Sequence, residues 1–332
     1  MKKILITGAE GFIGSHLTEC LVKLGNNVKA FTLYNSFNSK GWLDYCDKDI
    51  IKEFEIFSGD IRDLGSVRAA AKNCDIIIHL AALIGIPYSY HAPQSYIDTN
   101  IKGTQNVLET ARDFEVEKII HTSTSEVYGT ARFVPITEEH PLQAQSPYSA
   151  SKIGADQVAM SYYSSYNLPV TVLRPFNTYG PRQSMRAVIP TIIFQILKKK
   201  TSIDLGLLNP KRDFSYIDDT VEAFVKAIRL TKKHGDIINI GSNFEVSIRD
   251  TVQIISKLMG RKIKVTTDKR RLRPKASEVN RLLASNNKAK KIIKWQPKYS
   301  GQSGFKEGLS KTIKWFSQKN NLSIYNDDSF SL

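Results

Sequence analysis

Tyr148 and Lys152 are four residues apart, and their side chains together are suited to proton transfer. Ser146 and Pro147 before them are typical of a helix N-cap and first helical position. Residues i and i+4 share a helix face, so the phenol is expected beside the ammonium. A tyrosine with an ordinary pKa of about 10 is a poor base at neutral pH, and a neighbouring cation stabilises its phenolate. The pair predicts a base that removes a hydroxyl proton. A structural helix pair is the alternative.

A glycine-rich segment near the N-terminus predicts a dinucleotide-binding loop. Gly8, Gly11 and Gly14 follow an apolar run and precede an amphipathic pattern. In such a loop the first glycine permits a tight turn, the second lets the backbone approach a pyrophosphate, and the third lets the helix pack close to the sheet. The N-terminus of the helix then favours the anion. A glycine-rich turn without a ligand is the alternative.

The residues that would recognise the adenosine half of a dinucleotide are less complete. An acid at the end of the second strand commonly binds the ribose. Residues 31–35 read Phe-Thr-Leu-Tyr-Asn and contain no acid, and Lys29 and Lys40 are the nearest bases. Whether the cofactor carries a 2′-phosphate, as NADP does and NAD does not, is therefore left open. Asp60 is a candidate for bonding the adenine amine, and an ordinary turn aspartate is the alternative.

These residues must be positioned by alternating strands and helices. Strand-like apolar runs are separated by helical patterns, among them Asn100–Ala111 and Ser146–Tyr163. This alternation predicts an α/β fold, a Rossmann-type doubly wound parallel sheet with a smaller C-terminal substrate-binding domain. The expected strands are Lys2–Thr7, Val28–Leu33, Phe54–Ser58, Ile76–Leu80, Lys118–Thr122, Val170–Pro175 and Ile237–Ile240.

The change of texture after Gly180 predicts where the regions divide. Turn signals become more frequent there, and basic residues gather near the C-terminus. We expect a nucleotide-binding domain over residues 1–180, to which 212–242 returns. Residues 181–211 and 243–320 would bind substrate, and 321–332 would be a frayed tail.

Composition excludes several classes of protein. The chain has 332 residues and a formal net charge of +15. Its longest apolar run, residues 76–87, falls short of the roughly 20 residues of a membrane-spanning helix, so we expect no membrane span. The 3 cysteines form no CxxC pair, which argues against a disulfide framework and a zinc site and favours a cytoplasmic location. We therefore expect no bound metal.

The positive charge is concentrated in one segment. Residues 257–298 carry 15 Lys and Arg against 2 acids, a net of +13. Such a segment is typical of proteins that bind nucleic acid, an acidic membrane surface or a phosphate-bearing ligand, or it is a solvated face.

Several motifs together resemble the extended short-chain dehydrogenase/reductases, in the group of NAD-dependent nucleotide-sugar epimerases and dehydratases. The resemblance spans residues 1–285, most of the chain. It rests on the glycine loop, Gly59-Asp60-Ile61-Arg62-Asp63, His79-Leu80-Ala81-Ala82, Asn100-Ile101-Lys102-Gly103-Thr104, Tyr148 with Lys152, Leu173-Arg174-Pro175-Phe176-Asn177 and Arg212-Asp213-Phe214.

The segment Thr124-Ser125-Glu126 favours one branch of that group. Simple epimerases resemble this stretch but have small or uncharged residues at positions 125 and 126, whereas 4,6-dehydratases have Thr, then Asp or Ser, then Glu. A dehydratase must remove the C5 proton of the sugar, which a carboxylate such as Glu126 can do. Ser125 stands where glucose-type dehydratases have Asp, so which group protonates the leaving hydroxyl stays open. A solvated loop glutamate is the alternative.

The resemblance also implies the ligands. The substrate would be a nucleotide sugar, and the residues around Tyr34 and Glu126 resemble the dehydratases of the legionaminic acid pathway, which act on UDP- or GDP-N-acetylglucosamine. A homodimer would form through a four-helix bundle of Asn100–Ala111 and Ser146–Tyr163. The substrate contacts implied are Asn177, Arg212 and Arg273, and the contacts to NAD, with NADP left open, are Gly8, Gly11, Phe12, Ile13, Gly14, Asp60, Ile61, Ala81, Ala82, Asn100, Tyr148 and Lys152.

Two other functions remain as alternatives. The first is a sugar-nucleotide C4 epimerase, against which Glu126 argues. The second is a nucleic-acid-binding or scaffold protein on the same fold, suggested by residues 257–298. Binding to single strands favours aromatics among the bases, and Trp295 is the sole aromatic there. We therefore expect no nucleic-acid partner.

Overall fold

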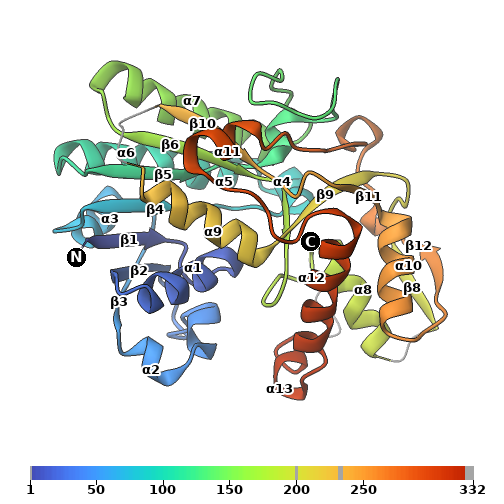
Figure 1. Ribbon diagram of the computed structural model, residues 1–332. Coiled ribbons are helices and arrows are strands. Elements are labelled where there is room, and N and C mark those ends of the chain that lie inside the picture. The colour runs from blue at the N-terminus through green and yellow to red at the C-terminus, as the bar shows by residue number, and fades with distance from the viewer. Residues whose placement is uncertain (1, 199–200, 231–234, 326–332) are drawn as a thin grey trace.

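The computed structural model describes residues 2–198, 201–230 and 235–325 and has a Rossmann-type α/β fold (Figure 1). Within these residues, seven parallel strands form the main sheet in the order β10-β6-β5-β4-β1-β2-β3. The expected fold is confirmed, and each expected strand lies within one residue of its bounds. The strands are β1 (Lys3–Thr7), β2 (Asn27–Leu33), β3 (Phe54–Gly59), β4 (Ile76–His79), β5 (Lys118–Thr122), β6 (Val170–Pro175) and β10 (Asp236–Ile240).

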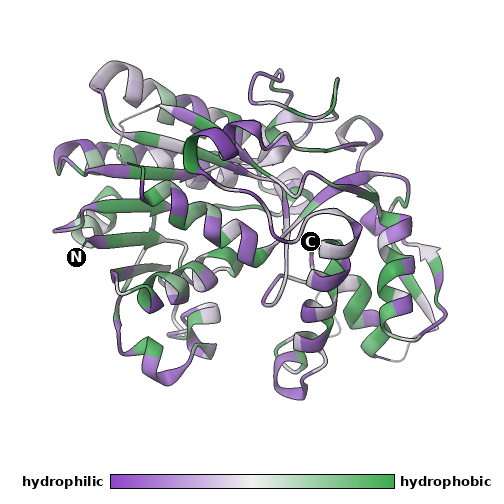
Figure 2. Cartoon of the chain, viewed as in Figure 1, coloured by the Kyte–Doolittle hydropathy of each residue, from purple (hydrophilic) through white to green (hydrophobic). Residues whose placement is uncertain are grey.

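Both faces of the main sheet are covered by helices, which explains why its strands are apolar almost throughout. Ile4 and Ile6 pack into one core cluster, whereas Leu5 between them packs into the other. Figure 2 shows the strands as largely apolar and the outer helices as mixed. Helices α1 (Phe12–Lys23) and α9 (Ile217–Ile228) pack together on the first face, and α3 (Leu64–Ala71), α6 (Gly103–Asp113) and α7 (Pro147–Tyr166) lie on the second.

The C-terminal part of the chain builds a smaller region beside the carboxyl ends of the strands (Figure 1). Strand β9 lies between β7 and β11, and β8 pairs with β12. The strands of the C-terminal part are β7 (Asn177–Tyr179), β8 (Ser202–Leu205), β9 (Lys211–Tyr216), β11 (Glu245–Ser247) and β12 (Lys264–Thr267). Its longer helices are α8 (Val188–Leu197), α10 (Ile248–Leu258), α11 (Asn287–Ile293) and α12 (Gly301–Phe316). Short helices elsewhere in the chain are α2 (Lys48–Ile51), α4 (Ile86–His91) and α5 (Pro93–Tyr96), and α13 (Lys319–Leu322) follows α12.

The segment 212–242 returns to the main sheet only in part. Strand β10 joins that sheet beside β6, and α9 packs on it, as expected. Strand β9 instead pairs with β7 and β11, so residues 212–216 belong to a separate sheet. Residues 211–216 are mostly polar and form no apolar run, so no strand is expected there from the sequence, and the pairing depends on contacts distant in the sequence. The division into domains otherwise stays a prediction.

The helix expected at Asn100–Ala111 differs at its beginning. Residues Ile97–Lys102 form a π-helix, η2, which runs directly into α6 at Gly103. The Asn100 side chain is bonded to Leu83 and Ser151 on neighbouring elements. These bonds fix the side chain within the wider turn, a feature frequent at functional sites.

The expected frayed tail begins too early. Residues Lys319–Leu322 form α13, and the Tyr325 hydroxyl donates to the Gln183 carbonyl at 3.0 Å. The Tyr325 ring also packs against Trp42, so apolar contacts hold a segment that reads as polar. Residues 326–332 lie outside the described residues. In the described part of the chain we find no helix long and apolar enough to cross a membrane.

Candidate active site

The loop between β1 and α1 is shaped by close backbone contacts. Gly8 has a left-handed φ of 69°, and its N–H donates to the Phe31 carbonyl of β2 at 3.0 Å. A methyl group at Gly14 would lie 2.2 Å from the Gly8 carbonyl oxygen, so α1 starts closer to the loop than another residue allows. Gly11 is the N-cap of α1 and has no side chain to bond the first N–H groups. Those N–H groups are available to an anion, which fits the expected pyrophosphate.

Gly14→Ala is expected to damage both stability and dinucleotide binding. The new methyl group would meet backbone atoms of Gly8 and Ala9, which cannot move without opening the loop. We expect a loss of about 3 kcal/mol of unfolding free energy, since overpacking commonly costs about 1–3 kcal/mol. Urea unfolding and titration with NAD measure the two effects. Gly65→Ala is the control, because its methyl group would make ordinary contacts of 3.5 Å or more; equal losses in both variants would contradict the prediction.

The segment after β4 is tied to this loop. Thr7 Oγ1 accepts hydrogen bonds from the backbone N–H groups of Leu80 and Ala81, each at 3.2 Å. Asn100 fixes the next residues, because its Oδ1 accepts from Leu83 N at 2.8 Å and its Nδ2 donates to Leu83 O at 2.9 Å. Both amide hydrogens of Asn100 are spent within the protein, the second on Ser151 Oγ. Asn100 is therefore suited to orienting residues 80–83, the segment that is expected to lie beside the cofactor.

The remaining expected cofactor residues border the same edge of the sheet. Asp60 forms a two-pronged ion pair with Arg62, with contacts of 2.6–3.1 Å, and also accepts from the Arg62 N–H. The Arg62 guanidinium lowers the pKa of Asp60. Asp60 thus stabilises the turn after β3 through its bonds to Arg62. A contact between Asp60 and adenine stays a prediction. Ile61 is buried, whereas Phe12, Ile13 and Ala82 are partly buried.

Tyr148 and Lys152 lie one turn apart in α7, and both side chains are buried. Lys152 Nζ donates to the Thr122 carbonyl at the end of β5 at 2.7 Å. Burial raises the pKa of Tyr148, and a hydrogen bond with the Thr124 side chain opposes that shift. Burial also lowers the pKa of Lys152 to about 8, against the attraction of Asp156. The structure thus brings Thr124, Tyr148 and Lys152 together.

The direction of the pKa shift at Tyr148 differs from the one expected from the sequence. We expected the neighbouring ammonium to favour the phenolate. In the protein alone the pKa of Tyr148 lies above its ordinary value, because the loss of water around the phenolate outweighs its favourable contacts. Tyr148 therefore holds its proton at neutral pH until other charges enter the site.

The lowered pKa of Lys152 predicts a pH-dependent stability. Between about 8 and its ordinary value of 10.5 the folded protein binds fewer protons at this site than the unfolded chain. Unfolding then takes up a proton, so stability rises with pH across this window, by about 3 kcal/mol in total. Urea unfolding of the wild type and of Lys152→Met at pH 7.5 and 10 isolates the effect. A constant difference between the two proteins at both pH values would show that Lys152 does not titrate in this window.

A buried charge cluster beneath this site was not found from the sequence. Asp156 follows Lys152 by one helical turn and pairs with Arg174 at 2.9 Å. It also accepts from Ser123 Oγ at 2.7 Å and contacts His121 Nε2 at 3.2 Å. The spacing of Tyr148, Lys152 and Asp156 along one helix face was the available signal. Asp156 thus holds α7 against the ends of β5 and β6.

Glu126 lies beside these residues in a short 3-10 helix, η3 (Ser125–Tyr128). Thr124 caps this helix by accepting from Glu126 N at 3.2 Å, and Ser149 of α7 donates to the Glu126 carbonyl at 2.6 Å. The Glu126 carboxylate is about nine-tenths buried, and its charge raises the pKa of Tyr148. Ser125 is also buried. The solvated-loop alternative for Glu126 is therefore wrong, since its side chain is buried and its carboxylate faces Arg273.

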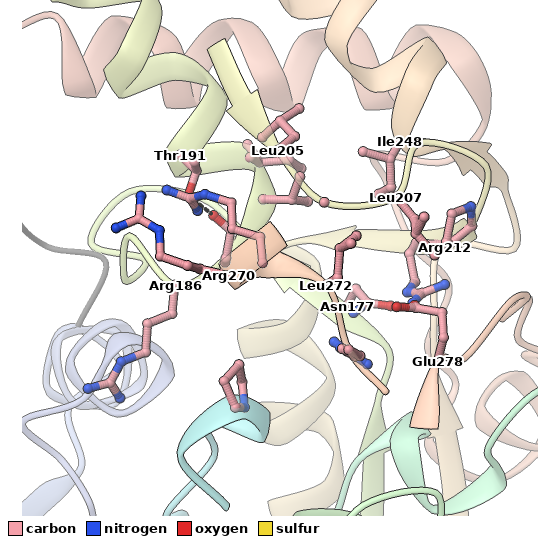
Figure 3. Close-up of a pocket in the computed structure, with 18 of the residues that line it drawn as sticks. Asn177, Arg186, Thr191, Leu205, Leu207, Arg212, Ile248, Arg270, Leu272 and Glu278 are labelled. Carbon is pink, nitrogen blue, oxygen red and sulfur yellow. Dashed lines mark hydrogen bonds and ion pairs between the residues drawn. The ribbon is translucent and has the colours of Figure 1, made fainter. Parts of the chain in front are cut away.

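A cavity of about 390 Å³ lies between α4 and the C-terminal region, and four arginines besides Arg212 line it. Figure 3 shows Asn177, Arg212 and Glu278 close together, with Arg186 and Arg270 farther along the pocket. Arg212 is buried and pairs with Glu278 at 3.2 Å. Burial lowers the pKa of Arg212, although Glu126 opposes the shift.

Asn177 Oδ1, Gln183 Oε1 and Arg273 Nη1 at this pocket are buried without a hydrogen-bond partner among the described residues. Arg273 Nη1 lies 3.7 Å from Glu126 Oε2, which joins this pocket to the expected catalytic carboxylate. Buried polar groups normally find partners, and such exceptions are typical of ligand sites. The pocket therefore places the three expected substrate residues next to the expected catalytic residues.

The basic segment 257–298 contributes directly to this pocket. Arg270, Arg271 and Arg273 line it and gather positive charge along one wall. Trp295 is fully buried, and its Nε1 donates to the Asp219 carbonyl at 3.0 Å. The Trp295 ring is thus not available for stacking on a nucleic-acid base. The three arginines of the segment line a pocket of the size that a small molecule fills.

Comparison with known proteins decides the family. The sequence model of the family described as GDP-mannose 4,6 dehydratase matches residues 5–308. The chain belongs to this family. The expected resemblance to nucleotide-sugar epimerases and dehydratases is thereby confirmed. The narrower resemblance to the dehydratases of the legionaminic acid pathway stays a prediction.

Relatives of this family member include both kinds of enzyme. A dTDP-D-glucose 4,6-dehydratase of Dictyostelium discoideum is 36% identical over 77% of the chain, which spans 62% of that protein's length. A UDP-glucuronate 4-epimerase of Thermodesulfobacterium geofontis is 32% identical over 96% of the chain and 97% of its own. The structure of a UDP-glucuronic acid 4-epimerase from Bacillus cereus, in complex with UDP-glucuronic acid and NAD, is 28% identical with a TM-score of 0.84, covering 97% of this chain and 100% of that one.

Proposed function

We propose that this protein is a sugar-nucleotide 4,6-dehydratase that uses NAD and converts UDP- or GDP-N-acetylglucosamine to the 4-keto-6-deoxy sugar nucleotide. The observation that carries the proposal is the buried Glu126 carboxylate beside Tyr148. A C4 epimerase transfers hydride at one carbon and needs no second base, whereas elimination across C5 and C6 does.

NAD as the cofactor is supported by the glycine loop and by a similar epimerase that binds NAD. Residues of the loop would hold the pyrophosphate, and Tyr148 and Lys152 would lie at the nicotinamide end. When bound, NAD supplies a cationic ring that adds to Lys152 in favouring the phenolate, accepts hydride from C4 and returns it to C6. The cofactor is regenerated in each turnover, so no net consumption is expected.

The residues have separate roles in the proposed reaction. Tyr148 takes the proton of the C4 hydroxyl, and Thr124 bonds the same oxygen. The C4 ketone acidifies the C5–H, whose proton Glu126 removes while the C6 hydroxyl leaves as water. Hydride returns to C6 and a proton to C5, which balances the reaction as the loss of one water. Either Ser125 or Glu126 would donate the proton to the departing hydroxyl.

The arginines of the pocket support an anionic substrate. Arg212 presents a buried guanidinium group and Arg273 a partly buried one, and such groups pair with a diphosphate through two parallel hydrogen bonds. Asn177 Oδ1 is a free acceptor beside them. We propose that these three residues hold the nucleotide diphosphate and so direct the sugar toward Glu126.

The test is incubation of the protein with UDP- and GDP-N-acetylglucosamine, followed by mass spectrometry. A product lighter by one water, formed without added reductant, is expected from one of the two substrates. The same assay identifies the preferred base. An unchanged mass with an inverted C4 would establish the second candidate, a C4 epimerase, which the similarity to 4-epimerases favours.

The setting of the reaction is also a proposal. The N-acetylglucosamine substrate would place the enzyme at the start of legionaminic acid biosynthesis, in the cytoplasm. We propose a homodimer through α6 and α7, which pack side by side on one face of the sheet. Sedimentation at micromolar protein tests the dimer, and a monomer alone would exclude it.

A further inference from the structure

Glu10 lies within the glycine loop, but its side chain reaches the end of the neighbouring strand. Its Oε1 accepts a hydrogen bond from the backbone N–H of Leu33, the last residue of β2, at 2.9 Å. The loop itself is fixed to β2, because Gly8 and Ala9 both donate to the Phe31 carbonyl. The side-chain bond to Leu33 and the backbone bonds of the loop to Phe31 therefore hold the Glu10 carboxylate at the carboxyl end of β2.

The second oxygen of this carboxylate is not satisfied by the described residues. Glu10 Oε2 is buried and has no hydrogen-bond partner among them. Burial raises the pKa of Glu10, and the bond from Leu33 opposes that shift. A buried carboxylate oxygen without a partner is costly, so it indicates a donor that belongs to a ligand.

The location of Glu10 matters because the usual residue is missing. Dinucleotide-binding sheets commonly use an acid at the end of β2 for the adenosine ribose, and residues 31–35 hold none. Of the nearest bases, Lys29 is buried and pairs with Glu55 at 3.2 Å, whereas Lys40 Nζ lies near the end of β2 and donates to Ser58 Oγ at 2.9 Å.

We propose that Glu10 takes the place of the missing acid: its carboxylate accepts a hydrogen bond from the adenosine 2′-hydroxyl and excludes a 2′-phosphate. This inference rests on the proposed function, which supplies the dinucleotide. It makes Glu10 the residue that selects NAD over NADP, from the glycine loop instead of from β2. A phosphate at the 2′ position would bring two negative charges against a buried carboxylate, whereas a hydroxyl supplies the donor that Oε2 lacks.

Binding measurements on the full-length protein, after removal of co-purified nucleotide, test this assignment without relying on turnover. Isothermal titration with NAD, NADP and 2′-deoxyadenosine NAD is compared between the wild type and Glu10→Gln. We expect the wild type to bind NAD at least about 10-fold more tightly than either analogue, the range of one hydrogen bond to a charged group. In Glu10→Gln both preferences should shrink by about 10-fold.

Asp44→Asn is the matched control. Asp44 accepts from Lys40 N at 2.8 Å and from Ser39 Oγ at 3.1 Å, so this variant disturbs the adjoining loop without altering Glu10. Its NAD-to-NADP ratio should equal that of the wild type, and urea unfolding should show both variants folded. An equal change of the ratio in Asp44→Asn would assign the effect to the loop and overturn the role of Glu10.

The outcomes separate this inference from the proposed function. If the wild type prefers NAD and Glu10→Gln keeps that preference, the assignment of Glu10 is wrong and the proposed cofactor stands. If the wild type binds neither dinucleotide, the proposed function fails and the assignment fails with it. A wild type that prefers NADP would contradict the assignment directly.

Discussion

Glu126→Gln is expected to abolish water elimination while leaving C4 oxidation detectable. Glutamine has nearly the same shape but cannot accept the C5 proton, so the reaction stops at the 4-keto sugar with the cofactor reduced. Loss of general base catalysis commonly lowers a rate by about 10²–10⁴-fold. The change should appear as reduced-cofactor absorbance in a single turnover, together with the loss of the dehydrated product by mass.

Binding measurements and a control variant show whether Glu126 acts as a base or only as a structural carboxylate. Glu126 pairs with Arg273 at 3.7 Å, so the amide also alters that contact. The affinity for the nucleotide diphosphate alone reports this effect and should change far less than the rate. Glu139→Gln, an exposed acid in a nearby loop, is the control and should retain full activity. Dehydrated product from Glu126→Gln at the normal rate would refute the proposed role.

Tyr148→Phe should block the reaction one step earlier. The variant keeps the aromatic ring and its edge contact with Tyr96, whose ring centre lies 6.2 Å away, so we expect a folded protein. Without the hydroxyl group no base receives the C4 proton, and hydride transfer should slow by about 10²–10⁴-fold. Neither reduced cofactor nor dehydrated product should accumulate in a single turnover, in contrast to Glu126→Gln.

A second tyrosine of α7 provides the control for this variant. Tyr162 is buried at the far end of the helix and donates to Glu109, so Tyr162→Phe also removes a bonded hydroxyl group. It should cost some stability and leave turnover unchanged. Rapid cofactor reduction in Tyr148→Phe would mean that another group accepts the C4 proton, and Tyr148 would then only bind substrate.

Features that depend on local spacing were predictable from the sequence. The i, i+4 relation of Tyr148 and Lys152 and the capping of α7 by Ser146 follow from helix geometry and side-chain chemistry. The glycine loop follows from the positions that cannot carry a Cβ. The strands of the main sheet were found because burial on both faces makes them apolar throughout.

The electrostatic character of these residues could not be read in the same way. The sign of the pKa shift at Tyr148 depends on how completely the fold removes water from the phenol, and the spacing to Lys152 does not reveal that. Strand β9 was not expected for a related reason, because its residues are mostly polar and its pairing with β7 and β11 is selected by residues far along the chain. Both errors come from burial and packing.

The sequence by itself determined the class of fold, the dinucleotide loop and the residue types of the catalytic group. Only the tertiary structure decided which of them meet: Glu126 with Arg273, Asp156 with Arg174, and Glu10 with the end of β2. The physical reason is range. Helical spacing and loop sterics act between near neighbours in the chain, whereas the burial of a charge and the choice of its partner are fixed only when distant segments pack together.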